Sequence, residues 1–164
     1  MITYRDATVS DLPVIVAIYN ATVPSRMVTA DTEPVSIESR LSWLHEHDPH
    51  TRPLWVIEEN NKNIIGWISF QSFYGRPAYA ATAEISIYLD ASHHGKGIGK
   101  QALQYCIDSA KSFGIQTLLG FIFAHNEPSL ALFHKMGFEE WAHLPGVAVL
   151  DGTERSLKIL GRKV

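Results

Sequence analysis

Residues 93–100, with the sequence HHGKGIGK, combine three glycines and two lysines. An apolar, β-branched run precedes them, and a run with helical periodicity follows. Backbone N–H groups at the start of a helix point toward a common anion, and the helix dipole adds to the attraction. Glycines let a bulky phosphate group approach the backbone. A tight turn needs only two of them, so Gly95, Gly97 and Gly99 predict an anion site.

Two known phosphate-binding motifs do not fit this segment. A P-loop has four residues between its first glycine and a Gly-Lys pair, followed by Ser or Thr. Here Gly95 precedes Gly99 by one residue too few, and Gln101 gives magnesium no hydroxyl ligand. A dinucleotide fingerprint requires G-x-G-x-x-G, whereas these glycines recur at every second position. The segment is therefore interpreted as a general helix N-terminal site for a phosphate or pyrophosphate.

Strands and helices that would position this loop follow from the periodicity. Strands are expected at 2–5, 54–57, 64–73, 82–89, 117–124, 138–143 and 155–160. Helices are expected after Ser10 or Asp11 as cap, from Ser36, over 97–113, and from Pro128 to a left-handed Gly137. Turns are expected at 60–63 and at Asp151-Gly152. The helices around the glycine loop are crossover connections, which predict a mixed α/β layout with parallel strands.

The strand expected at 82–89 alternates in polarity. Ile85, Ile87 and Leu89 share one face, and Glu84, Ser86 and Tyr88 share the other. The run 117–124 is nearly continuously apolar, which is typical of a strand covered on both faces.

Composition indicates one globular domain over residues 1–164, with 46% apolar and 19% charged residues. A net charge of −3 argues against nucleic acid as the main partner. Neither a signal peptide nor a membrane-length apolar run is seen, and one cysteine excludes an internal disulfide, so a cytoplasmic protein away from membranes is expected. His45, His47 and His50 lack the partners of a zinc site and are expected to be solvated, and no metal is expected.

Several segments resemble the GNAT superfamily of acyl-CoA-dependent N-acetyltransferases. They are EISIYLD, ASHHGKGIG and FIFAHNEPSLALFHKMGF, in that order. Gly97 and Gly99 match the family's Gln/Arg-x-x-Gly-x-Gly/Ala loop, with His94 at the Gln/Arg position. The segments TADTEP, GRPAY, TAE and NEPS are most similar to the phosphinothricin and methionine sulfoximine acetyltransferases. The resemblance implies a GNAT-like fold: a twisted mixed sheet of about six to seven strands with about four helices on both faces.

The resemblance also implies acetyl-CoA as cosubstrate and assigns roles to matching residues. The coenzyme is expected to contact Ile87, Tyr88, Leu89, Gly95, Lys96, Gly97, Ile98, Gly99, Lys100, Asn126 and Ser129. The Leu89 N–H is expected to bind the thioester oxygen. Glu84, the one acidic residue in its strand, is the expected general base, with a structural salt bridge as the alternative.

No general acid is assigned, because Phe133 occupies the position of the tyrosine that many family members use. Phe133 is expected in the core or along the coenzyme wall. Cys106 lies within a predicted helix without a histidine partner, so a buried structural thiol is expected. Direct attack of the amine in a ternary complex is therefore predicted.

The acceptor is expected to be a small amino-acid analogue of the phosphinothricin or methionine sulfoximine type. Arg76 is the candidate clamp for its carboxylate, and Phe73, Tyr74 and Tyr79 are the candidate walls. Arg26 and residues 29–33 are expected to form the other rim. A protein or peptide acetyltransferase and a catalytically silent CoA-binding module are alternatives. The resemblance suggests a homodimer.

Overall fold

The computed structural model describes residues 1–60 and 62–164. Seven strands in these ranges form one sheet in the order β1-β2-β3-β4-β5-β7-β6. They are β1 (Ile2–Asp6), β2 (Leu54–Glu59), β3 (Asn63–Ser72), β4 (Thr82–Leu89), β5 (Thr117–Phe123), β6 (Glu139–Leu150) and β7 (Thr153–Lys163). β4 and β5 are parallel and the other neighbours are antiparallel. The mixed α/β fold expected from the sequence is confirmed.

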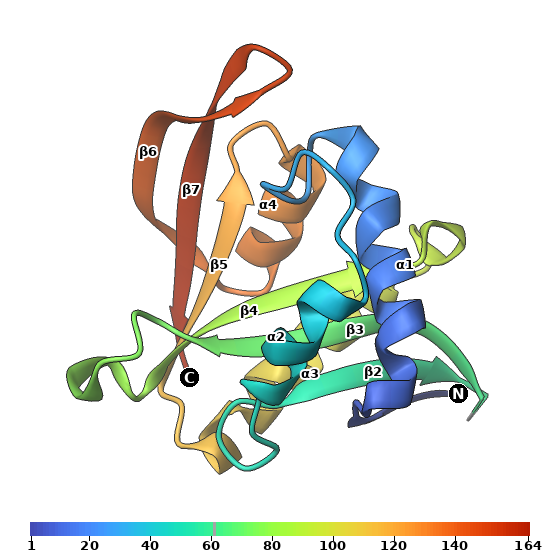
Figure 1. Ribbon diagram of the computed structural model, residues 1–164. Coiled ribbons are helices and arrows are strands. Elements are labelled where there is room, and N and C mark those ends of the chain that lie inside the picture. The colour runs from blue at the N-terminus through green and yellow to red at the C-terminus, as the bar shows by residue number, and fades with distance from the viewer. Residues whose placement is uncertain (61) are drawn as a thin grey trace.

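Helices cover both faces of this sheet, as predicted (Figure 1). They are α1 (Leu12–Thr22), α2 (Leu41–His45), α3 (Ile98–Ser109) and α4 (Glu127–Lys135), with short 3-10 turns between elements. One apolar cluster packs α1 and the α2 segment on β2 and β3, through residues such as Ile15, Val56 and Trp67. A larger cluster packs α3 and α4 on the other face, through residues such as Phe70, Leu103 and Phe133.

The predictions for α1, α3 and α4 are confirmed, whereas the predicted start of the second helix is wrong. Pro13 lies in the first turn of α1, Gly114 (φ +72°) follows the 3-10 extension of α3, and Gly137 (φ +86°) follows α4. The second helix does not begin at Ser36. The Ser36 hydroxyl accepts the N–H of Ser39 in a local turn, and α2 starts only at Leu41 after the 3-10 turn Glu38–Arg40.

Two further local details differ from the sequence-based expectation. The Asp11 carboxylate does not cap α1; it accepts the Thr8 N–H (2.8 Å) and pairs with Arg5 (2.9 Å). The expected turn at 60–63 includes residue 61, which lies outside the described residues.

The last two strands extend well beyond 138–143 and 155–160. Pro145 and Gly146 interrupt the pattern in the sequence, yet they lie inside β6, where the register with β7 shifts between Leu144 and Ala148. An edge strand tolerates proline at such a bulge because one side of it makes no ladder bonds. The Asp151-Gly152 turn is confirmed between these two strands.

Candidate functional site

The site is centred where β4 and β5 separate. The two strands pair from Thr82↔Thr117 to Glu84↔Leu119, and within the described residues their pairing ends there. Beyond this point β4 runs toward α1 while β5 turns away with β6 and β7, which opens a V in the sheet (Figure 1). A parallel pair that stops halfway leaves backbone groups of both strands without ladder partners.

The open edge of β4 belongs to Ile87 and Leu89. The Asp90 N–H donates to the Ile65 carbonyl of β3 (2.8 Å), and alternate residues of an antiparallel strand direct both backbone groups to the same neighbour. The even-numbered residues of β4 therefore face β3, and the odd-numbered ones face β5. His94 Nε2 donates to the Leu89 carbonyl on this edge (3.1 Å). The N–H groups of Ile87 and Leu89 are thus directed into the V.

The glycine loop lies at the far end of β4 and leads into α3. Gly95 (φ +76°) and Gly97 (φ +79°) adopt left-handed conformations, and a Cβ built on either one meets no atom within 4 Å. Gly97 is the N-cap of α3, so the N–H groups of Ile98, Gly99 and Lys100 lie in its first turn, where helical partners are missing. Bare backbone therefore faces open space there, as an anion site requires.

A narrow groove runs along the V between β4, β5 and α4. It is lined by Val28, Ile85, Ser86, Ile87, Tyr88, Gly120, Phe121, Ile122, Asn126, Ser129 and Phe133. A Cβ on Gly120 would lie 2.5 Å from the Phe133 ring, so only glycine lets this ring pack on β5. The expectation that Phe133 packs in the core is confirmed, and its ring also lines this groove.

Two residues at the start of α4 hold the neighbouring loop. Asn126 Oδ1 accepts the Ser129 N–H (3.3 Å), and its Nδ2 donates to the Met27 carbonyl (3.2 Å). His125 Nε2 donates to the Arg26 carbonyl (2.8 Å). Asn126 thus both caps α4 and fixes the segment around residues 26–28 beside the groove.

Glu84 lies at the point where the strands diverge, on the face that carries Ser86 and Tyr88. Its carboxylate lines a cavity with His47 and Gln71 and a second one with Ser86 and Tyr88. Burial raises the pKa of Glu84 above the usual glutamate value. Among the described residues no hydrogen bond or ion pair engages this carboxylate, which disfavours the salt-bridge alternative.

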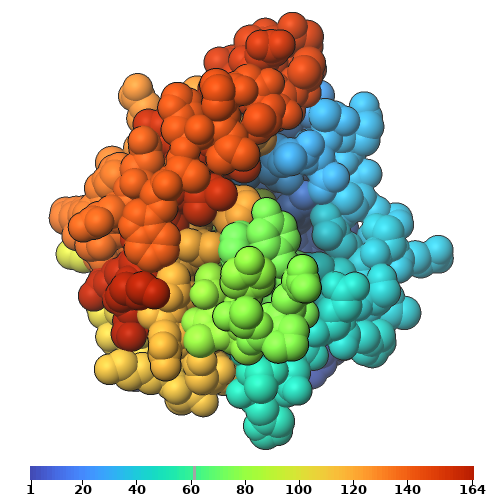
Figure 2. Space-filling model, turned by 90° about the vertical axis from the view of Figure 1, so that its left-hand side faces the viewer, coloured from blue at the N-terminus to red at the C-terminus, as the bar shows by residue number. Residues whose placement is uncertain are grey.

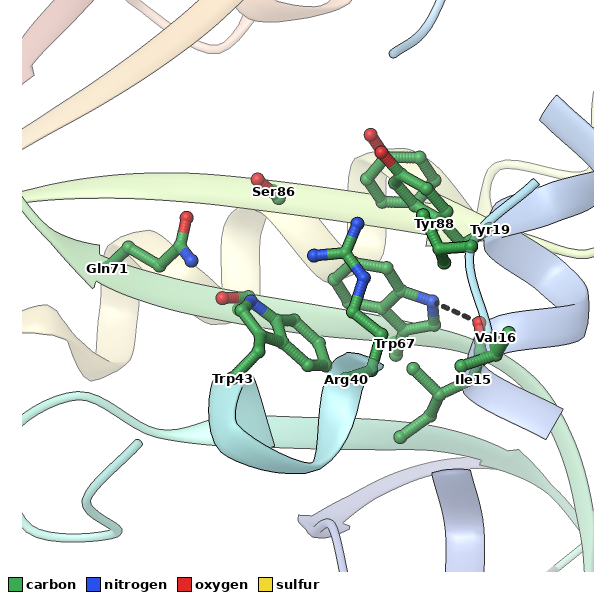
Figure 3. A pocket seen from close by; sticks show the side chains of 11 residues that line it. Ile15, Val16, Tyr19, Arg40, Trp43, Trp67, Gln71, Ser86 and Tyr88 are labelled. Atoms are coloured by element: carbon green, nitrogen blue, oxygen red, sulfur yellow. Dashed lines mark hydrogen bonds between the residues drawn. The ribbon is translucent and has the colours of Figure 1, made fainter. Parts of the chain in front are cut away.

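A third cavity of about 170 Å³ adjoins these two; we call it the Arg40 cavity (Figure 3). Its walls are largely aromatic, from Tyr19, Trp43, Trp67 and Tyr88, and Ser69, Gln71 and Ser86 contribute polar groups. The Arg40 guanidinium lies 4.8 Å from the Tyr19 ring centroid and 5.6 Å from that of Trp43. None of these residues except Tyr88 was predicted from the sequence to belong to a site. The one available signal was the Arg40-x-x-Trp43 spacing, which places both side chains on one helical face.

The predicted acceptor residues lie on the β3–β4 loop, away from the Arg40 cavity. This loop forms a protrusion at the centre of the face shown in Figure 2. Tyr74 is 77% exposed, and Phe73, Tyr74 and Tyr79 contact one another. Arg76 is exposed, and its guanidinium makes no hydrogen bond or ion pair within the described part of the chain. Arg76 and Tyr79 line a further cavity. It shares Arg52, Ser72 and Gly75 with the cavity that Glu84 lines together with His47 and Gln71.

The histidines and the cysteine complete the comparison with the sequence. Cys106 is fully buried, and burial raises the pKa of its thiol, so the predicted structural role is confirmed. His45 and His50 are exposed as expected. His47 is a wrong prediction: its Nδ1 donates to the Trp43 carbonyl (2.8 Å) and its Nε2 accepts the Ser69 hydroxyl (2.8 Å). The His47 ring also packs edge-on against the Trp43 ring, with 5.0 Å between the centroids, and its burial lowers its pKa.

The described residues contain no cluster of His, Cys, Asp or Glu suited to a metal ion. None of the helices in these residues is both long and apolar enough to cross a membrane.

Comparisons with known proteins agree on one family. The model of the acetyltransferase (GNAT) family matches residues 15–138. YwnH of Bacillus subtilis, whose name assigns it provisionally to the phosphinothricin acetyltransferases, is 54% identical over 162 residues, 99% of each chain. An L-methionine sulfoximine/L-methionine sulfone acetyltransferase of Pseudomonas aeruginosa is 31% identical over 87% of this chain and 83% of its own. A phosphinothricin acetyltransferase of Sinorhizobium meliloti, solved with acetyl-CoA, superimposes with a TM-score of 0.92 at 26% identity, covering 99% and 88% of the two chains.

Proposed function

Because the chain belongs to the GNAT family of acetyltransferases, we propose that it moves the acetyl group of acetyl-CoA to the primary amine of a small amino-acid acceptor. The observation that carries this proposal is the opening between β4 and β5. Along β4 it brings together an unpaired backbone edge, the glycine loop at the start of α3 and the half-buried Glu84 carboxylate, which has no hydrogen bond or ion pair within the described residues. The acceptors named for the relatives, phosphinothricin and methionine sulfoximine or sulfone, define the class.

The coenzyme is held mainly by backbone groups. Its diphosphate lies against the N–H groups of the α3 first turn, where the left-handed Gly95 and Gly97 keep side chains away. Its pantetheine arm enters the groove between the strands and accepts hydrogen bonds from the edge of β4. Lys96 and Lys100 are exposed beside the loop and add positive charge.

Glu84 acts as the base for the acceptor ammonium group. A carboxylate whose pKa is raised by burial accepts a proton more readily than an exposed one. Once Glu84 holds this proton, directly or through a water, the amine nitrogen attacks the thioester carbon. The C–N bond forms, the C–S bond breaks, CoA leaves as the thiolate, and the second surplus proton on the nitrogen passes to solvent water. Holding amine and thioester together contributes the largest share of the acceleration.

Backbone N–H groups on β4 stabilise the oxyanion of the tetrahedral intermediate. Leu89, the donor expected from the sequence, lies five residues from Glu84, or about 16 Å along the strand. Ile87 faces the same gap and lies about 10 Å from Glu84. A carboxylate and an oxyanion donor that serve one acetyl group must be close together, so the spacing favours Ile87 as donor and leaves Leu89 to the pantetheine.

Direct attack of the amine on the thioester is consistent with the properties of Cys106 and Tyr88. Cys106 is fully buried and its thiol pKa is raised, so it is a poor acyl carrier. Burial also raises the pKa of Tyr88, which makes its hydroxyl a weak proton donor to a thiolate. We therefore assign no general acid, since a CoA thiolate leaves without one.

The test is CoA release with a panel of acceptors: methionine sulfoximine, methionine sulfone, phosphinothricin and N-terminal peptides. The small amino acids are expected to react and the peptides to remain inert; the reverse preference would replace this proposal with peptide acetylation. Glu84→Gln is expected to lower kcat about 10²- to 10⁴-fold with acetyl-CoA affinity nearly unchanged. The wild-type rate should fall as pH drops through the raised pKa of Glu84, and this limb should disappear in Glu84→Gln. Unchanged turnover would reject Glu84 as the base.

A further inference from the structure

We propose that Arg40 determines acceptor specificity by binding oxygen atoms at the end of the acceptor's side chain, inside the Arg40 cavity. This inference rests on the proposed function and adds the residue that reads the acceptor tail. The expected acceptors are amino acids with an apolar side chain that ends in oxygens on sulfur or phosphorus.

The Arg40 guanidinium has more N–H donors than it uses in hydrogen bonds to the described residues. Its Nη2 bonds Asp31 Oδ2 at 3.2 Å, and within the described residues this is its only hydrogen bond. Its side chain is 25% exposed, and the rings of Tyr19 and Trp43 lie against it. Figure 3 shows the guanidinium pointing into the cavity toward Ser86 and Tyr88. A guanidinium carries five N–H donors in a planar fork, so four of them have no hydrogen-bond partner among the described residues.

The cavity suits a tail that is apolar first and polar at its end. Four aromatic side chains form its walls, and they can pack on methylene and methyl groups. Close to the guanidinium lies the Ser86 hydroxyl, a second donor on the β4 side of the cavity (Figure 3). Paired oxygens on sulfur or phosphorus can accept from both.

The register of β3 and β4 separates this tail site from the amine site. Glu84 is opposite Gln71, Ser86 is opposite Ser69, and Tyr88 is opposite Trp67. Successive pairs on this face are about 6.7 Å apart. Arg40 lies over Tyr19, whose ring is 5.2 Å from that of Tyr88, so the guanidinium is one to two pairs away from Glu84.

This separation decides between the two oxygen-bearing groups of such an acceptor. The α-carboxylate oxygens lie about 3 Å from the amine nitrogen, so with a hydrogen bond of about 3 Å at each end they span about 9 Å, short of two pairs. A terminal oxygen five bonds from the nitrogen lies roughly 6 Å away in an extended chain, and the same two hydrogen bonds give a span of about 12 Å toward Arg40. The α-carboxylate is left to the other side of Glu84, where Arg76 lies.

The experiment compares L-methionine sulfone with L-methionine, which has the same chain without the oxygens. Arg40→Met keeps the apolar stem of residue 40 and removes its donors. It is expected to lower kcat/KM for the sulfone about 10- to 150-fold and for methionine less than 3-fold. Lys111→Met, an exposed charge on the 3-10 extension of α3, is the matched control and should change neither.

Three outcomes would overturn the inference while the proposed function stands. Equal losses for both acceptors mean that Arg40 does not read the tail. A loss that vanishes with the carboxamide of methionine sulfone means that Arg40 reads the carboxylate. Tryptophan fluorescence of the wild-type protein tests the proposal without relying on a folded variant. Because Trp43 and Trp67 line the Arg40 cavity, their emission should change more when methionine sulfone binds than when methionine binds. Equal changes would contradict the proposal. Wild-type enzyme that acetylates no amine in the panel would instead reject the proposed function.

Discussion

The proposed site has two halves, one for the coenzyme and one for the acceptor, and they are built from different parts of the chain. The coenzyme half consists mainly of backbone: the open edge of β4, the glycine loop and the first turn of α3, all within residues 87–100. The acceptor half consists of side chains, and Tyr19, Arg40, Trp67 and Tyr88 meet there from four separate segments. Backbone recognition depends on local conformation, whereas side-chain recognition depends on packing between distant elements. A substitution should therefore affect one substrate and spare the other.

Apart from Glu84→Gln and Arg40→Met, the largest kinetic effect is expected from Gly97→Ala. Gly97 has φ +79°, where a residue with a Cβ costs about 1–2 kcal/mol, and the new methyl group would stand where the diphosphate approaches. The KM for acetyl-CoA should rise about 10-fold or more while the KM for the acceptor stays constant, as measured by steady-state kinetics. Gly152→Ala, at φ +76° in the β6–β7 turn, is the control for strain alone and should leave both KM values unchanged. Equal effects on the two substrates would remove the division into halves.

A smaller effect is expected from Arg76→Ala on the acceptor side. Arg76 is exposed, so water screens its interaction with a carboxylate. The KM for the acceptor should rise about 3- to 5-fold, less than the effect of Arg40→Met, and the KM for acetyl-CoA should not change. If acetyl-CoA binding weakens equally, Arg76 is not a carboxylate clamp.

The smallest effect is expected on thermal stability, from the substitution Glu84→Gln. Glu84 lies between the coenzyme half and the acceptor half. Its pKa is raised by burial, so the folded state binds its proton more tightly than the unfolded state. The favourable contribution of protonated Glu84 is complete below the unfolded pKa and is lost as pH rises through the folded pKa. Glu84→Gln should therefore raise Tm by a few degrees or less at pH 8, and the gain should vanish below about pH 4. A lower Tm at pH 8 would show that the carboxylate stabilises the fold.

Much of the coenzyme half could be read from the sequence. The strand 82–89 was predicted with the bounds that the structure gives, and the alternation of Glu84 with Ile85 assigned its two faces correctly. The helix after the glycine loop was predicted over 97–113 from helical periodicity, and α3 with its 3-10 extension covers Ile98–Phe113. In contrast, β6 was predicted only over 138–143, because the sequence does not show that this strand lies at a sheet edge, where a bulge at Pro145 and Gly146 is tolerated.

By itself, the sequence determined the elements that depend on neighbouring residues: the glycine loop before α3, the polarity of β4 and the place of Glu84 on it. Only the tertiary structure decided that β5 leaves β4 at Glu84 and that Arg40 reaches the cavity beside Trp67 and Tyr88. The physical reason is the distance along the chain over which the interactions act. Backbone conformation follows from adjacent side chains, whereas a cavity forms where α1, α2 and the sheet pack together, and no local pattern encodes which side chains will face one another there.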